Sequence, residues 1–339
     1  MLILLAPDCR PEDRDAIVDK IQGAGCTVSS LPTAHGEVLV AEGDLDRLDR
    51  IPIGVHPGVK KIVGLSEAYA LTSREHQADP TIVEVGPVRI GGGGFTIIGG
   101  PCAVESREQV FEAAQAVKDA GADMLRGGAY KPRTSPYSFR GLGIDGLMLL
   151  REAGQATGLP TVSEVCDPRH IEAMMTNVDM LQIGTRNMSN FDLLIEVGKS
   201  GHPVLLKRGR SATIADWLLA AEYILAQGNP NVVLCERGIR GFDSATRNTL
   251  DLAAIPAVRA RSHLPIVIDP SHATGGSACV PPLARAAIAA GADGVMIETH
   301  IDPTCAKSDA EQAMLPSDFH DLCDDLRLIH KVTNRSVDA

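Results

Sequence analysis

Short apolar runs alternate with amphipathic, helix-like stretches along the chain from residue 95 to residue 298. Runs of this kind are typical of parallel strands that are covered on both faces. The predicted strands are residues 95–99, 124–126, 161–165, 180–183, 204–207, 232–235, 266–269 and 294–298. Eight alternating units favour a closed (β/α)8 TIM barrel over an open doubly wound sheet. No GxGxxG turn directly joins a predicted strand to the next helix, which weakens the dinucleotide-binding alternative further.

The N-terminal residues follow a different pattern, which predicts a separate domain at 1–72. The expected elements are a strand (1–6), a helix that starts near Pro11, strands 27–31 and 37–41, a helix (44–50) and a strand (61–65). This βαββαβ order predicts a small ferredoxin-like α+β domain. We expect the polar stretch 73–80 to be a linker and residues 81–339 to form the barrel domain, which opens with a β-hairpin.

Composition excludes several classes of partner. The formal net charge is −11 and no basic tract interrupts it, so nucleic acid and anionic membrane surfaces are poor partners. The longest apolar runs are far shorter than the roughly 18 residues that a membrane span needs, and no secretory signal is visible. The eight cysteines lack CxxC or disulfide-framework spacing, which indicates reduced thiols in a cytoplasmic protein.

Ionisable residues gather at the ends of the predicted strands, where the active sites of such barrels lie. Most of them are cations, although the protein is acidic, and this concentration suits ligands with phosphate and carboxylate groups. The cations are Arg126, Lys131, Arg133, Arg186, Lys207, Arg208 and Arg237. Lys131 and Arg133 flank Pro132 and precede Thr134, an arrangement that predicts a phosphate-binding loop. Glu164 also follows a strand.

A second group at the strand ends combines soft and hard donor atoms. It contains one thiol, one imidazole and two carboxylates: Cys102, His272, Glu298 and Asp309. Such a set suits a divalent first-row metal ion, with Mn, Fe, Co and Zn all possible. The spacing matches neither a zinc finger nor HExxH, so the prediction depends on the barrel bringing distant segments together. His300 is an alternative ligand that ranks below His272.

Several motifs resemble those of 3-deoxy-D-arabino-heptulosonate 7-phosphate (DAHP) synthases. They are GPCAVES (100–106), LRGGAYKPRTS (125–135), IGTRN (183–187), CERG (235–238) and DPSH (269–272), together with the Ile297-Glu298 and Ser308-Asp309 pairs. The resemblance covers about residues 80 to 335. The N-terminal domain is similar to the ferredoxin-like regulatory extension of the type I-beta subgroup. The resemblance therefore implies a metal-dependent transferase of the shikimate pathway, which condenses phosphoenolpyruvate (PEP) with erythrose 4-phosphate and releases phosphate.

The resemblance also implies a role for each motif residue. Metal binding is implied for Cys102, His272, Glu298 and Asp309; PEP binding for Arg126, Lys131, Arg186, Lys207 and Arg237; and aldose phosphate binding for Arg133 and Thr134. The catalytic residues would be Lys131, Glu164 and His272. Lys131 is the candidate proton donor to the aldehyde oxygen, and Glu164 is an electrostatic partner of the cations or a water-orienting base.

Two other functions stay open at this level. The related 3-deoxy-D-manno-octulosonate 8-phosphate synthases join PEP to arabinose 5-phosphate, but they carry Asn where this chain has Pro132. A non-catalytic regulatory barrel is the other alternative, although every expected ligand position is filled. By the same resemblance, the N-terminal domain would bind an aromatic amino acid, Tyr or Phe, as feedback effector. The family also implies a homotetramer.

Overall fold

A computed structural model describes residues 1–339 except 34–35, 44, 49–50, 64–68, 134 and 334–339. The chain divides into two compact units, Met1–Tyr69 and Ala70–Ala339. No helix in the described ranges is both long and apolar enough to cross a membrane.

The N-terminal unit is a four-stranded antiparallel sheet with the order β2-β3-β1-β4. Its elements are β1 (Leu2–Leu5), α1 (Pro11–Gly23), β2 (Thr27–Thr33), β3 (Gly36–Glu42), α2 (Leu45–Leu48) and β4 (Val59–Val63). Pro11 starts α1, where its fixed φ suits the first helical turn. Ile17 and Ile21 lie one turn apart on α1 and pack with Ile3 and Leu39 of the sheet. The element order confirms the predicted ferredoxin-like α+β domain.

The second unit contains a closed barrel of eight parallel strands. They are β7 (Thr96–Gly100), β8 (Met124–Arg126), β9 (Thr161–Val165), β10 (Met180–Ile183), β11 (Val204–Lys207), β12 (Val232–Glu236), β13 (Ile266–Ile268) and β14 (Gly294–Glu298). Pairing of β14 with β7 closes the ring. The (β/α)8 prediction is confirmed, and no strand end differs from its predicted position by more than one residue.

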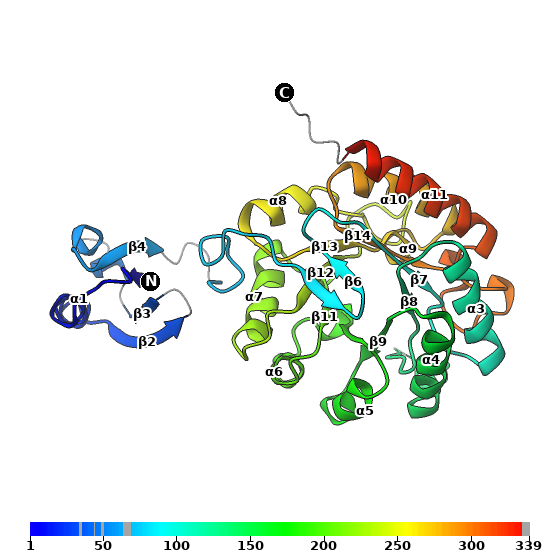
Figure 1. The fold of residues 1–339 in the computed structure, drawn as a ribbon, viewed down its shortest axis with the longest axis horizontal. Coiled ribbons are helices and arrows are strands. Elements are labelled where there is room, and N and C mark those ends of the chain that lie inside the picture. The colour runs from blue at the N-terminus through cyan, green and yellow to red at the C-terminus, as the bar shows by residue number, and fades with distance from the viewer. Residues whose placement is uncertain (34–35, 44, 49–50, 64–68, 134, 334–339) are drawn as a thin grey trace. The chain divides into compact units, whose positions relative to one another are not determined.

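Helices surround the barrel (Figure 1). They are α3 (Arg107–Asp119), α4 (Ile144–Thr157), α5 (Ile171–Met175), α6 (Phe191–Lys199), α7 (Ile214–Leu225), α8 (Ala254–Arg261), α9 (Pro270–Thr274), α10 (Val280–Ala289) and α11 (Pro316–Thr333). Side-chain caps fix several helix starts. The hydroxyl of Ser106 accepts a hydrogen bond from the Gln109 N–H at the start of α3, and Thr213 with Asp216 forms a capping box on α7.

The barrel interior changes from apolar to ionisable along each strand. Its apolar layer consists of Ile98, Met124, Val162, Met180, Leu205, Val233, Cys235, Val267 and Met296. Side chains alternate between the two faces of a strand, so residues two positions later also point inward. Those later residues include Arg126, Glu164, Gln182, Lys207, Asp269 and Glu298. The strand period therefore places the ionisable groups at the C-terminal mouth.

A β-hairpin closes the opposite, N-terminal end of the barrel. It consists of β5 (Val83–Val85) and β6 (Val88–Ile90), and Figure 1 shows it lying across the barrel opening. Val83, Val85 and Ile90 are fully buried in the same cluster as the apolar strand residues. The hairpin thus completes the apolar layer and keeps water from that end.

The segment that leads into the hairpin is bonded to the barrel unit. The Glu222 carboxylate on α7 accepts hydrogen bonds from three successive backbone N–H groups, those of residues 70–72. The ring of His263 bonds to the Leu71 carbonyl oxygen (2.8 Å) and to the Thr81 hydroxyl (2.7 Å). The predicted linker, residues 73–80, therefore lies between two anchored points, residues 70–72 and Thr81.

Candidate active site

The four predicted metal ligands come together at the barrel mouth. Cys102 follows β7, His272 lies in α9 after β13, Glu298 ends β14, and Asp309 lies in the loop after β14. One donor atom from each residue lies within 4.8 Å of all the others. The Cys102 Sγ is 3.0 Å from the Asp309 Oδ2, and the His272 Nε2 is 3.2 Å from the Glu298 Oε1. Segments more than 200 residues apart in sequence thus meet in one cluster.

The imidazole in this cluster is oriented by a carboxylate behind it. The Asp269 Oδ2 is 2.8 Å from the His272 Nδ1, so the Nε2 faces Glu298 and the cluster. Asp269 also accepts a hydrogen bond from Lys207 and one from the His272 backbone N–H. Burial lowers the pKa of His272, which favours the neutral imidazole that metal ions require.

The thiol and carboxylates of the cluster carry shifted pKa values. Burial, reinforced by Glu298, raises the pKa of Cys102 to about 12. Burial also opposes ionisation of Glu298, but His272 and Arg126 more than offset it and lower the pKa of that carboxyl. Two carboxylates, an imidazole and a thiol that ionises on coordination fit a divalent first-row metal ion. The cluster thus has the donor chemistry of a metal site.

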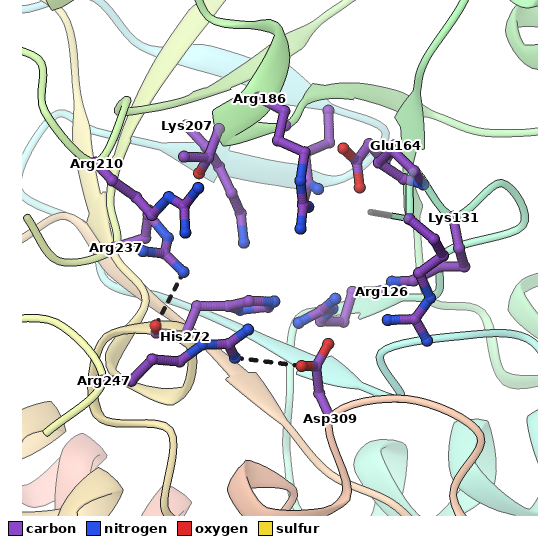
Figure 2. Close-up of a pocket in the computed structure, with 15 residues that line it drawn as sticks. Arg126, Lys131, Glu164, Arg186, Lys207, Arg210, Arg237, Arg247, His272 and Asp309 are labelled. Carbon is purple, nitrogen blue, oxygen red and sulfur yellow. Dashed lines mark hydrogen bonds and ion pairs between the residues drawn. The ribbon is translucent and has the colours of Figure 1, made fainter. Parts of the chain in front are cut away.

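Next to this cluster is a pocket lined mainly by cations, shown in Figure 2. The cations are Arg126, Lys131, Arg133, Arg186, Lys207, Arg210, Arg237 and Arg247. Arg126 is paired with Glu298 at 2.8 Å, and Lys207 is paired with Asp269. Within the ranges that the structure describes, no carboxylate forms an ion pair with Arg186 or Arg210. The excess of positive charge makes the pocket suited to anionic ligands.

Burial, together with neighbouring cations, lowers the pKa of two of these arginines. Burial lowers the pKa of Arg237, whose guanidinium donates to the carbonyl oxygens of Gly238 and, at 2.9 Å, of His272. Burial and the nearby Arg240, Arg186 and Arg247 lower the pKa of Arg210. Each shift means that the cation is less stable there than in water. A bound phosphate or carboxylate would remove that penalty.

Lys131 connects the pocket with the cluster. Its Nζ is 2.9 Å from both the Sγ and the carbonyl oxygen of Cys102. Burial opposes its charge, but Cys102 and Glu164 more than offset this effect and raise the pKa of Lys131, which favours the ammonium form of the amine. Glu164 faces the same pocket beside Gly184, where an added Cβ would lie only 1.8 Å from the Glu164 Oε1. Gly184 therefore leaves the space that Glu164 occupies.

The remaining predicted residues differ in position. Arg133 lines the pocket and donates hydrogen bonds to the carbonyl oxygens of Phe139 and Lys307. Thr134 lies outside the described residues. The His300 Nε2 is 3.7 Å from the Glu105 Oε1, and His300 does not belong to the four-residue cluster.

Arg208, which the sequence predicted at the barrel mouth, does not line the pocket, whereas Arg210 does. Arg208 directly follows β11, yet it is buried and pairs with Glu236 (3.2 Å) and Asp251 (2.8 Å) instead of lining the pocket. Arg210 and Arg247 do line it, and sequence reasoning missed both. Arg210 follows the end of β11 by three residues, so its sequence position could have placed it at the barrel mouth. The sequence position of Arg247 could not, because it lies well beyond the end of β12.

Comparison with known proteins agrees with this geometry. The profile of the DAHP synthetase I family matches residues 71–334. The chain is 48% identical over 269 residues to the phospho-2-dehydro-3-deoxyheptonate aldolase of Thermotoga maritima, covering 79% of this chain and 80% of that protein. It is 35% identical over 257 residues to a 2-dehydro-3-deoxyphosphooctonate aldolase of Caulobacter vibrioides, covering 70% of this chain and 88% of that protein.

Solved structures show the same similarity. The crystal structure of the Thermotoga maritima phospho-2-dehydro-3-deoxyheptonate aldolase (DAHP synthase) aligns with a TM-score of 0.79 at 41% identity, over 98% of this chain and 97% of that one. A truncated form of the 3-deoxy-D-arabino-heptulosonate 7-phosphate synthase from the same organism aligns with a TM-score of 0.73 at 44% identity, over 78% and 97%. From its sequence, its barrel and the residues gathered at the barrel mouth, the chain belongs to the DAHP synthetase I family.

Proposed function

We propose that this protein condenses PEP with D-erythrose 4-phosphate and water to give DAHP and inorganic phosphate, through the residues gathered at the barrel mouth. One observation carries the proposal: a four-residue cluster of metal-donor atoms borders a pocket with unpaired cations. The reaction needs both features, because it joins two phosphorylated substrates at an aldehyde carbon that must be made electrophilic. DAHP synthases are metal-dependent, in agreement with the cluster.

In this proposal Cys102, His272, Glu298 and Asp309 hold the metal ion. When bound, the ion acts as a Lewis acid toward the aldehyde oxygen. Mn, Fe, Co and Zn all suit one thiolate, one imidazole and two carboxylates.

PEP binding is assigned to the cations that line the inner pocket. Arg186 and Arg237 hold the phosphate, since neither has an acidic partner in the described chain. Lys207 and Arg126 complete the set from inside the barrel, where Asp269 and Glu298 hold them in place. Arg133 and Thr134 are assigned to the phosphate of the aldose. Two phosphates bound on either side of Lys131 would place the reacting carbons beside its amine.

Lys131 is the proposed proton donor. Carbon 3 of PEP attacks the aldehyde carbon, and the aldehyde oxygen takes a proton from the Lys131 Nζ. Carbon 2 of PEP becomes cationic and bonds to the oxygen of a water molecule that Glu164 orients, and the proton that this water loses returns to the Lys131 amine. The new hydroxyl on carbon 2 then becomes a carbonyl as the bond between carbon 2 and the phosphate oxygen breaks, and the hydroxyl proton leaves with inorganic phosphate. His272 contributes through its Nε2, which its bond to Asp269 keeps directed at the cluster.

The test is phosphate release from PEP after treatment with EDTA and after Mn²⁺ is added back. Erythrose 4-phosphate is the expected aldose, and arabinose 5-phosphate is the paired control. Turnover that Mn²⁺ restores with the four-carbon sugar alone supports the proposal. Turnover with the five-carbon sugar would indicate an octulosonate 8-phosphate synthase, and no turnover with either would indicate a non-catalytic regulatory barrel.

We also propose that the N-terminal domain, residues 1–72, binds an aromatic amino acid and lowers the activity of the barrel. The Thermotoga maritima structure aligns over 98% of the chain and so shares this domain. Inhibition by Tyr or Phe that persists after deletion of residues 1–72 would contradict this role. A homotetramer is proposed by family resemblance and can be measured by sedimentation velocity. All eight cysteines are free thiols, which supports a cytoplasmic location.

A further inference from the structure

We propose that Gln312 and Arg247 are positioning residues of the metal cluster: together they orient the carboxylates of Glu298 and Asp309. The inference rests on the metal site proposed above. Neither residue is a member of the four-residue cluster. Their contacts with its carboxylates show how the two side chains would act.

The two oxygens of Glu298 face different partners. The Oε1 lies 3.2 Å from the His272 Nε2 and accepts a hydrogen bond from Arg126 at 2.8 Å. The Oε2 accepts a hydrogen bond from the Gln312 Nε2. Gln312 is 1% exposed, so this bond is protected from water. Gln312 thereby sets the rotation of the Glu298 carboxylate and keeps the Oε1 directed at the cluster.

The two carboxylate oxygens of Asp309 also face different partners. Its Oδ2 lies 3.0 Å from the Cys102 Sγ, whereas its Oδ1 accepts a hydrogen bond from the Arg247 Nη1 at 3.2 Å, as Figure 2 shows. The backbone of Asp309 is left-handed (φ 53°), the only positive φ at a non-glycine residue in the described parts of the chain. Such a conformation persists where surrounding contacts hold it, and here Arg247 supplies one.

A direct bond joins the two positioning residues. The Arg247 Nη1 donates to the Gln312 Oε1 at 2.9 Å. A carboxylate can only accept hydrogen bonds and a guanidinium can only donate them, so the Gln312 amide has one possible orientation between Glu298 and Arg247. The short 3-10 helix Ala310–Gln312 places positions 309 and 312 one turn apart, on the same face.

The loop that carries Arg247 is also hydrogen-bonded to the segment that carries His272. The Arg247 backbone N–H bonds to the Thr274 carbonyl oxygen at 3.0 Å, and the Asn248 side chain donates to the His272 carbonyl oxygen at 3.2 Å. Gly275 (φ 72°) packs against the Arg247 side chain, where an added Cβ would lie 2.8 Å from the Arg247 Cβ. One loop thus connects the segments that carry His272 and Asp309.

Positioning and simple electrostatics predict opposite effects of removing Arg247. A guanidinium repels a nearby divalent cation, so charge alone predicts tighter metal binding when Arg247 becomes Met. If Arg247 orients the carboxylates, the same change weakens metal binding. Arg210→Met is the matched control, because it removes the same charge from the same pocket, and no carboxylate in the described chain forms an ion pair with Arg210.

The experiment measures Mn²⁺ binding to the full-length protein by equilibrium dialysis, without substrates. We expect the Mn²⁺ Kd to rise about 10- to 100-fold in Gln312→Met and in Arg247→Met, the usual cost of losing a group that orients a metal ligand. In Arg210→Met the Kd should stay unchanged or fall. Gln312→Met keeps the side-chain length and apolar packing. Melting of the metal-free variants near the wild-type temperature shows that they are folded.

Three outcomes overturn the inference. Arg247→Met that binds Mn²⁺ as tightly as wild type, or more tightly, would mean that Arg247 does not orient the carboxylates. Mn²⁺ loss in Cys102→Ser but in neither positioning variant would leave the metal site standing and refute only the positioning role. Full Mn²⁺ binding by Cys102→Ser would refute the metal site and this inference together. If Gln312→Met does not fold, Arg247→Met carries the test, because its side chain is 47% exposed.

Discussion

The two ends of the barrel are built from the same strands and have opposite chemistry. At the N-terminal end, Met124, Val162 and Leu205 join the buried hairpin in an apolar layer. Two residues later on these strands stand Arg126, Glu164 and Lys207, which line the pocket at the mouth. One strand period therefore separates the part of the barrel that stabilises the fold from the part that binds ligands.

The difference has an energetic reason. Burial of a Val, Leu or Met side chain stabilises a fold by about 1.5–3 kcal/mol, so the apolar layer favours folding. Buried ion pairs such as Arg126 with Glu298 seldom add net stability, because each charge must lose its hydration. Arg186 and Arg210 are exposed and form no ion pair with a carboxylate of the described chain. The charged mouth therefore contributes less to the stability of the fold than the apolar layer does.

The largest expected effect is at the metal cluster. Cys102→Ser should lower the rate of phosphate release at least about 1,000-fold, because the ion contributes several kcal/mol to the transition state. Phosphate release is measured at saturating Mn²⁺, PEP and erythrose 4-phosphate. The melting temperature without metal should stay close to wild type. Activity above a tenth of the wild-type value would argue against a ligand role for Cys102.

A smaller effect is expected for an unpaired cation of the pocket. Arg186→Ala should lower kcat/KM for PEP about 10- to 100-fold, the cost of one charged hydrogen-bonding group. Its melting temperature should stay equal to wild type or rise, because the change relieves repulsion between cations. Steady-state kinetics and thermal unfolding of the same preparation provide the comparison. A joint loss of activity and stability would assign Arg186 to the scaffold instead.

The affinity for Mn²⁺ should increase as the pH rises. With its pKa raised to about 12, Cys102 is a thiol between pH 6.5 and 8.5, and metal binding as the thiolate must release that proton. The Mn²⁺ Kd should therefore fall about tenfold for each unit of rising pH. Equilibrium dialysis at several pH values measures the slope. A slope that is equally steep in Cys102→Ser would show that another group releases the proton.

The smallest effect is expected at the closed end. Ile90 of the hairpin is fully buried, and Ile90→Val should lower stability by about 0.5–1.5 kcal/mol. The kcat/KM for PEP should stay within twofold of wild type, since Ile90 lies in the apolar layer and not in the pocket. Thermal unfolding and kinetics together check this. A large change in kcat/KM would show that the two ends of the barrel are coupled.

The sequence predicted the positions of site residues within strands better than those of residues in the loops that follow. Arg126, Lys207 and Glu298 lie within strands, so the period of two sets their direction and the sequence placed them correctly at the mouth. Arg208 lies one residue beyond a strand and turns instead toward Glu236 and Asp251. Its loop conformation depends on contacts with residues of β12 and beyond, which no local pattern encodes.

By itself, the sequence determined the two-part organisation, the eight strands and the identity of the groups that meet at the barrel mouth. These follow from short-range rules, because apolar runs define strands and parallel strands deliver their ends to one face. Only the tertiary structure decided which cations remain unpaired and that Arg247 reaches Asp309 and Gln312. Those contacts join loops far apart in the chain, and side-chain pairing between loops depends on their three-dimensional course.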